Sequence, residues 1–421
     1  MSRLRQLGAA AWRAPFVVHL CVYVVLLVVV VARGGADTSA SSDEGAYLVQ
    51  ARALDRGSWV VVYPQAAADP EYAHYPFINA DVRTVGGYLF PGRPVYPWLL
   101  SQTTSVLGES LGAHLLSMLG AIGAAAVAWS LGAMFDPRLR RTMFWLVALG
   151  PPLINAGFVW AHALSAALGG LAVLGMVGLM RDRSLRWAAP ALAVGCVGGV
   201  LVRTEGALLV ITVMVALLVT LARRRELGRV ALVGAIGVAS VGAALAQRAW
   251  ASHLEEGAVV AAARPTDGGG GRFNGIVHDV LLTSFFEDRA ELLGLLAVLF
   301  LTLGVALLAR GGPSRQRDAR VALVVAAVAV VVRCIVVPDD ISTGLLYGWP
   351  IATVALAATR WRDLNDVERS IAATIVGFTA LLALTDYDAG GGFQWAGRYL
   401  SPITVPIALF AAIAATRTLE P

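Results

Sequence analysis

Long apolar stretches alternate with short polar segments along almost the whole chain. A helix that crosses a bilayer needs roughly 20 mostly apolar residues. The pattern predicts about twelve such helices (11–13), at residues 15–33, 111–135, 142–158, 162–180, 187–203, 206–222, 230–250, 290–309, 321–337, 345–360, 370–385 and 402–416. We therefore expect an all-α polytopic membrane protein with one integral-membrane domain over residues 1–421.

The composition supports a lipid environment. Of the 421 residues, 57% are hydrophobic and 14% are charged, whereas soluble domains carry about 25% charged residues. Such a chain has too few polar groups to cover a water-exposed surface. The formal net charge of +5 does not indicate a nucleic-acid partner. The cysteines Cys21, Cys196 and Cys334 fall inside apolar runs, where buried structural thiols are expected.

The basic residues predict the orientation of the helices. All 33 of them are Arg, and cytoplasmic loops of membrane proteins are enriched in such residues. They cluster in the N-terminal tail and then at every second turn, near residues 138–141, 181–186, 223–229, 310–320 and 360–369. This alternation predicts that both termini are cytoplasmic. The expected location is the plasma (inner) membrane. Segments 34–110, 251–289, 338–344 and 386–401 then face the other side.

The largest outer segment, 34–110, begins with a conspicuous acidic pair, Asp43-Glu44. Ser41 and Glu44 have the spacing of a capping box, which starts a helix. Asp43 then favours the positive end of that helix. On this interpretation the pair is only structural; on the alternative it is catalytic. The two residues differ by about 100° around a helix, so we expect different roles for them.

A second polar feature closes the same segment. The stretch Phe90-Pro91-Gly92-Arg93-Pro94-Val95-Tyr96-Pro97-Trp98 holds one Arg among prolines that restrict its backbone. Arg93 lies on the side that is otherwise poor in Arg, and a guanidinium binds phosphate through paired hydrogen bonds. Snorkelling to lipid headgroups or a loop salt bridge is the alternative.

These motifs resemble the GT-C superfamily of polytopic glycosyltransferases. The similarity is greatest to the branch of protein O-mannosyltransferases and lipid A aminoarabinose transferases. In that branch the Asp of an Asp-Glu pair in the first outer loop acts on the acceptor. A Lys-Pro-Pro-Leu-Tyr-Tyr-Trp-Leu motif closes the loop, and its Lys contacts the phosphate of a lipid-linked donor. The resemblance implies that Asp43, with Glu44, is catalytic and that Arg93 replaces the Lys. Tyr47 and Tyr96, within the matching motifs, are candidate substrate contacts.

Two later motifs resemble elements of the same superfamily. Arg203-Thr204-Glu205-Gly206 is similar to its Arg-x-Asp/Glu-Gly turn, and Gly397-Arg398-Tyr399-Leu400-Ser401-Pro402 to its Gly-Arg-Tyr-Leu-x-Pro element. The resemblance implies that Arg203 and Arg398 also bind the donor phosphate. Glu205, Trp395 and Tyr399 are further substrate-contact candidates. Mutual neutralisation of Arg203 and Glu205, and an interfacial aromatic belt, are the structural alternatives.

The expected activity is transfer of a sugar from a polyprenyl-phosphate donor to an acceptor hydroxyl of a glycan, lipid or protein on the outer face. No cofactor is expected, because His74, Asp43, Asp69 and Asp81 match no defined metal-site spacing. A transporter or flippase is the alternative, but such proteins carry ionisable groups near the middle of their spans, where this sequence has few. A surface-glycan polymerase or ligase would use similar lipid-linked substrates.

Overall fold

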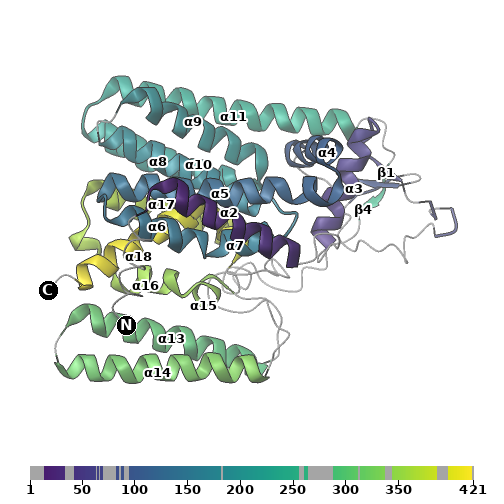
Figure 1. The fold of residues 1–421 in the computed structure, drawn as a ribbon. Helices are drawn as coiled ribbons and strands as arrows, with labels where there is room; N and C mark the ends of the chain where they lie inside the picture. Colours follow the sequence, from purple (N-terminus) through teal and green to yellow (C-terminus); the bar gives the residue numbers. More distant parts are fainter. Residues whose placement is uncertain are drawn as a thin grey trace.

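The structure is a computed structural model of the chain. It describes residues 14–33, 42–62, 64–65, 67–69, 82–84, 87–89, 94–181, 184–255, 260–263, 288–311, 313–336, 344–385 and 397–419. Helices form most of this part, and they lie side by side in a bundle with α13 and α14 along one flank (Figure 1).

The helices of the first half are α2 (Phe16–Arg33), α3 (Ser42–Asp55), α4 (Val95–Leu107), α5 (Glu109–Phe135), α6 (Leu139–Ala148), α7 (Pro151–Ala156), α8 (His162–Met180), α9 (Leu185–Val202) and α10 (Thr204–Arg223). Those of the second half are α11 (Leu227–Glu255), α13 (Asp288–Arg310), α14 (Pro313–Val336), α15 (Leu345–Gly348), α16 (Pro350–Ala358), α17 (Asp366–Thr385) and α18 (Thr404–Leu419). Two 3-10 helices, η1 (Trp361–Asp363) and η2 (Arg398–Ile403), complete the set.

The predicted helical, multi-pass architecture is confirmed. Within the described ranges, nine helical segments are long and apolar enough to cross a membrane: α2, α5, α8, α9, α10, α11, most of α13, α17 and the run Arg398–Thr416. The three other predicted spans also fall on helix, but none is among the nine. Segment 321–337 lies mostly in α14, and the other two are each divided into two shorter helices.

Proline explains both divisions. Segment 142–158 divides between α6 and α7 at Gly150-Pro151, and segment 345–360 divides between α15 and α16 at Trp349-Pro350. A proline lacks the N–H that would continue the helical ladder, and it disfavours helical backbone at the preceding residue. It fits the first turn of a new helix, where both prolines lie.

The described parts of segment 34–110 form two helices, α3 and α4, and most of a small sheet. The sheet has the order β1-β3-β2-β4, from β1 (Val61–Val62), β2 (Val82–Thr84), β3 (Gly87–Leu89) and β4 (Val260–Ala263), all antiparallel. Val82 pairs with Ala263, so the segment after α11 joins the first one. These strands of two to four residues are too short to produce a detectable two-residue periodicity.

Close approach between helices fixes the centre of the bundle. A Cβ atom at Gly120 of α5 would lie 2.2 Å from the Leu164 nitrogen of α8, and one at Gly169 of α8 would lie 2.2 Å from the Pro402 carbonyl oxygen of η2. Small residues at such contacts let helix backbones approach in a membrane. Gly169 therefore holds η2 directly against α8.

Replacing Gly169 by Ala should destabilise the protein by about 1–3 kcal/mol, the usual cost of overpacking, because the added methyl group meets main chain that cannot rotate away. Thermal unfolding of the purified protein in detergent measures this. Gly242→Ala on α11 is the matched control, since a Cβ there meets nothing within 4 Å. An equal effect of both substitutions would contradict the proposed contact.

At one end of the bundle, arginine side chains donate hydrogen bonds to the last carbonyl oxygens of several helices. Arg181 donates to the Met134 carbonyl oxygen in the last turn of α5. Arg224 and Arg229 donate to the Met180 and Leu179 carbonyl oxygens of α8, at 2.6 and 2.9 Å, and Arg360 donates to the Ala309 carbonyl oxygen of α13 at 3.5 Å. Cations are favourable at helix C-termini. These turns lie at the opposite end of the molecule from α3 and the sheet (Figure 1).

Candidate functional site

Five polypeptide segments meet near the other end of the bundle: α3, α4, the turn between α7 and α8, the junction of α9 and α10, and η2. Side chains from these segments form one connected group of rings, guanidinium groups and carboxylates. We call this group the Arg203–Arg398 cluster. It comprises Glu44, Tyr47, Tyr96, Trp160, His162, Arg203, Glu205, Arg398 and Tyr399.

The junction of α9 and α10 carries a buried ion pair. Arg203 lies between the two helices in extended backbone (φ −143°, ψ 152°). Its Nε and Nη2 donate to the two carboxylate oxygens of Glu205, at 3.0 and 2.6 Å. The side chains are only 15% and 7% exposed. The mutual neutralisation considered from the sequence is thus present. The pair also fixes the guanidinium plane, so that Nη1 donates to the Tyr47 hydroxyl oxygen at 3.4 Å.

A second guanidinium, that of Arg398, also lies near the ring of Tyr399. The carbon at the centre of the Arg203 guanidinium is 5.6 Å from the Tyr399 ring centroid, and that of Arg398 is 5.1 Å away. Arg398 also lies 5.0 Å from the Trp160 ring centroid and donates to the Tyr399 hydroxyl oxygen at 3.2 Å. Contacts of cations with ring faces are favourable. Two predicted phosphate-binding arginines are therefore brought to one aromatic ring.

Glu44 has a structural partner far away in the sequence. Its side chain is buried, and one carboxylate oxygen accepts a hydrogen bond from the Val159 N–H at 2.8 Å. This bond holds the start of α3 against the turn between α7 and α8. At the end of α3, the exposed Arg52 donates two hydrogen bonds of 2.6 Å to Glu109 of α5. The capping-box partner Ser41 lies outside the described residues.

Asp43 lies in the first turn of α3, immediately before Glu44. Only its backbone is described, so the direction of its side chain stays a prediction. Arg93 and Trp395 both lie outside the described residues. Of the predicted site residues, the structure therefore brings together Glu44, Tyr47, Tyr96, Arg203, Glu205, Arg398 and Tyr399.

Tyr96 and Tyr47 form a ring pair within this cluster. Their centroids are 5.0 Å apart at 74°, an edge-to-face contact. Tyr96 is 1% exposed, and burial raises the pKa of its hydroxyl group, which therefore stays neutral. Tyr96 thus supports the ring of Tyr47, which in turn receives the hydrogen bond from Arg203.

Three aromatic residues of the turn between α7 and α8 were not recognised from the sequence as part of the site. Phe158 and Trp160 are stacked at 4.4 Å and 13°. His162, the first residue of α8, is buried with its ring 5.9 Å from that of Tyr399. The alternating spacing of Phe158, Trp160 and His162 is the signal that could have indicated them. No group of three possible metal ligands occurs among the described residues.

Replacing Glu44 by Ala should lower the free energy of unfolding by roughly 1–3 kcal/mol, because the Val159 N–H loses a buried acceptor. Glu44→Gln retains one acceptor oxygen, so its loss should be smaller. Thermal unfolding in detergent distinguishes the two variants. If Glu44 also takes part in the chemistry, Glu44→Gln will lose activity beyond its loss of folded protein; unchanged activity would limit Glu44 to the structural role.

The chain shows similarity to a known protein at the level of structure. No family model matches the chain, and no curated protein matches it. Among solved structures, the chain is similar to ArnT from Cupriavidus metallidurans, whose crystal structure contains bound undecaprenyl phosphate. The sequence identity is 15%, the match covers 96% of this chain and 77% of that chain, and the TM-score is 0.45.

Proposed function

We propose that this chain is a membrane glycosyltransferase of the GT-C type. It would move a sugar from a polyprenyl-phosphate donor to an acceptor hydroxyl group. The observation that carries this proposal is the Arg203–Arg398 cluster. There, two buried guanidinium groups share the Tyr399 ring, and a hydrogen bond from Arg203 reaches α3, the helix that carries Asp43. Cations and aromatic faces are the groups that a sugar phosphate requires for binding.

In the proposed reaction, Asp43 accepts the proton of the acceptor hydroxyl group while that oxygen attacks the anomeric carbon. The bond between this carbon and the phosphate oxygen breaks, and polyprenyl phosphate leaves with the bonding electrons. A positioned general base contributes typically 10²–10⁴-fold. Direct displacement of this kind inverts the anomeric centre relative to the donor.

Negative charge gathers on the leaving phosphate, and fixed cations stabilise it in a site from which water is excluded. Arg93 is the proposed direct contact, together with Arg398. Arg203, a further candidate for the phosphate contact, also has a structural role. Because Glu205 occupies two of its nitrogen atoms and Tyr47 a third, Arg203 also holds α3 in register with α10. Tyr399 and Trp395 are the proposed sugar-stacking residues.

The experiment that tests this function follows a radiolabelled sugar in membranes that contain the chain. Supplied as polyprenyl-phosphate sugar, the label should leave the lipid fraction and enter an acceptor fraction, with release of an equal amount of polyprenyl phosphate. A flippase would instead leave all label on the lipid and change only its accessibility from one side. Movement without release of polyprenyl phosphate would therefore refute the proposed transfer.

A further inference from the structure

A cavity of about 340 Å³ lies at the other end of the bundle, away from the Arg203–Arg398 cluster. It lies between the end of α13, the link from α16 through η1, and the last turns of α18. The lining residues are Leu308, Ala309, Arg310, Gly311, Ala358, Thr359, Arg360, Asp363, Leu364, Phe410, Ile413 and Ala414. Its volume falls within the range of small-molecule sites.

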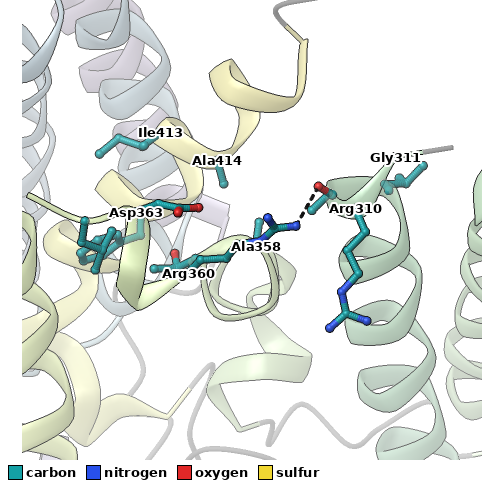
Figure 2. Close-up of a pocket in the computed structure, with 12 residues that line it drawn as sticks. Arg310, Gly311, Ala358, Arg360, Asp363, Ile413 and Ala414 are labelled. Carbon is teal, nitrogen blue, oxygen red and sulfur yellow. Dashed lines mark hydrogen bonds between the residues drawn. The ribbon is translucent and has the colours of Figure 1, made fainter.

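One part of this cavity favours a cation. The helix α16 ends there, and a helix C-terminus carries partial negative charge. The carboxylate of Asp363 also faces the cavity (Figure 2). Asp363 is exposed, and its carboxylate makes no ion pair with the residues that the structure describes. A small ammonium group with N–H donors would satisfy it.

The rim of the same cavity favours an anion. Arg310 and Arg360 are exposed and belong to the lining. The bond that Arg360 makes to the Ala309 carbonyl oxygen is long, at 3.5 Å (Figure 2), and it uses one N–H of the five that a guanidinium offers. The remaining donors have the fork geometry that matches a phosphate group.

One wall of the cavity is apolar. Phe410 and Ile413 of α18 and Leu364 form it, and all three are buried. The neighbouring Trp361 is a large apolar side chain that is 56% exposed. Trp is enriched where a membrane protein meets the lipid headgroups. The cavity therefore combines a carboxylate, a guanidinium group and an apolar wall.

We propose that this cavity binds the headgroup of an ethanolamine phospholipid. The ammonium group lies against Asp363, the phosphodiester against Arg360, and the glycerol with its first acyl carbons along Phe410 and Ile413. A choline phospholipid has the same phosphate and the same net charge, but its ammonium has no N–H to donate. A phospholipid whose headgroup is glycerol has no ammonium group at all.

The test measures lipid binding to the purified full chain in detergent, through quenching of Trp361 fluorescence by lipids with brominated acyl chains. The signal is the difference between the unaltered protein and Trp361→Phe. We expect the ethanolamine lipid to bind at least about tenfold more tightly than its choline counterpart, as for a hydrogen bond between charged groups. Equal affinity for the two lipids would overturn the proposal.

Substitutions test which residues contact the lipid headgroup. Asp363→Asn should reduce the preference for ethanolamine to within about twofold, whereas Arg360→Gln should weaken binding of both lipids several-fold. Asp366→Asn is the matched control, because it removes a nearby exposed carboxylate outside the cavity, and it should preserve the preference. Retention of the preference in Asp363→Asn, or its loss in Asp366→Asn, would refute the assignment.

A competition experiment distinguishes a lipid ligand from a soluble one. Phosphoethanolamine without acyl chains should displace the brominated lipid only at far higher concentration, because it lacks contacts with the apolar wall. Displacement at equal concentration would show a site for a soluble phosphate ester instead. Thermal unfolding of each variant confirms that it is folded.

Discussion

Replacing Asp43 by Asn should lower sugar transfer by roughly 10²–10⁴-fold, the usual contribution of a positioned general base. An amide has the shape of the carboxylate but cannot accept the proton of the acceptor hydroxyl group. The donor phosphate does not contact Asp43 in the proposed geometry. The apparent affinity for the polyprenyl-phosphate sugar should therefore stay within a few-fold of its original value.

The measurement is the initial rate of transfer in membranes, normalised to the amount of folded protein. Asp318→Asn is the control, because Asp318 is an exposed carboxylate near the beginning of α14, outside the Arg203–Arg398 cluster. It should leave the rate unchanged. A fully active, folded Asp43→Asn protein would show that the base is another group.

The second large effect concerns the ion pair between Arg203 and Glu205. Glu205→Gln should cost about 3–5 kcal/mol of stability, because it leaves the buried guanidinium without its compensating charge. Replacing both residues by apolar side chains of similar volume should restore most of that loss. Transfer should stay low in the double variant, since Tyr47 and Tyr399 then lose the guanidinium that they contact.

The exposed pair of Arg52 and Glu109 provides the control. It has the same residue types and similarly short bonds, but its side chains are 52% and 61% exposed. Glu109→Gln should therefore change stability by less than about 1 kcal/mol. Thermal unfolding in detergent compares the two pairs directly. Equal losses at both sites would show that burial does not determine the strength of the Arg203–Glu205 pair.

Much of the fold could be predicted from the sequence because a helix that spans a lipid bilayer must be long and mostly apolar. Each of the twelve predicted spans falls on helix. The two divisions could also have been anticipated, because Pro151 and Pro350 interrupt the apolar runs 142–158 and 345–360. The small sheet could not, since its strands are short and β4 comes from a segment far along the chain.

The candidate site, too, could be predicted only where its contacts join residues that are close in the sequence. Arg203 and Glu205 are two positions apart, so their ion pair could be considered from local sequence. The bond from Val159 to Glu44 joins residues 115 positions apart and leaves no local pattern. The sequence could therefore suggest a helix cap for Glu44 but not the contact that fixes α3 to the turn before α8. Trp160 was missed for the same reason, because its partner Arg398 lies in a distant motif.

The arginines that close helix ends have a consequence for biosynthesis. In all four contacts the donor follows the acceptor in the chain, by 47 positions for α5, 44 and 50 for α8, and 51 for α13. A growing chain is synthesised from its N-terminus, so each of these carbonyl groups receives its guanidinium only after the next helices have been made. Later segments thus complete the hydrogen bonding of earlier helices, so the bundle becomes stable in the order in which its helices are synthesised.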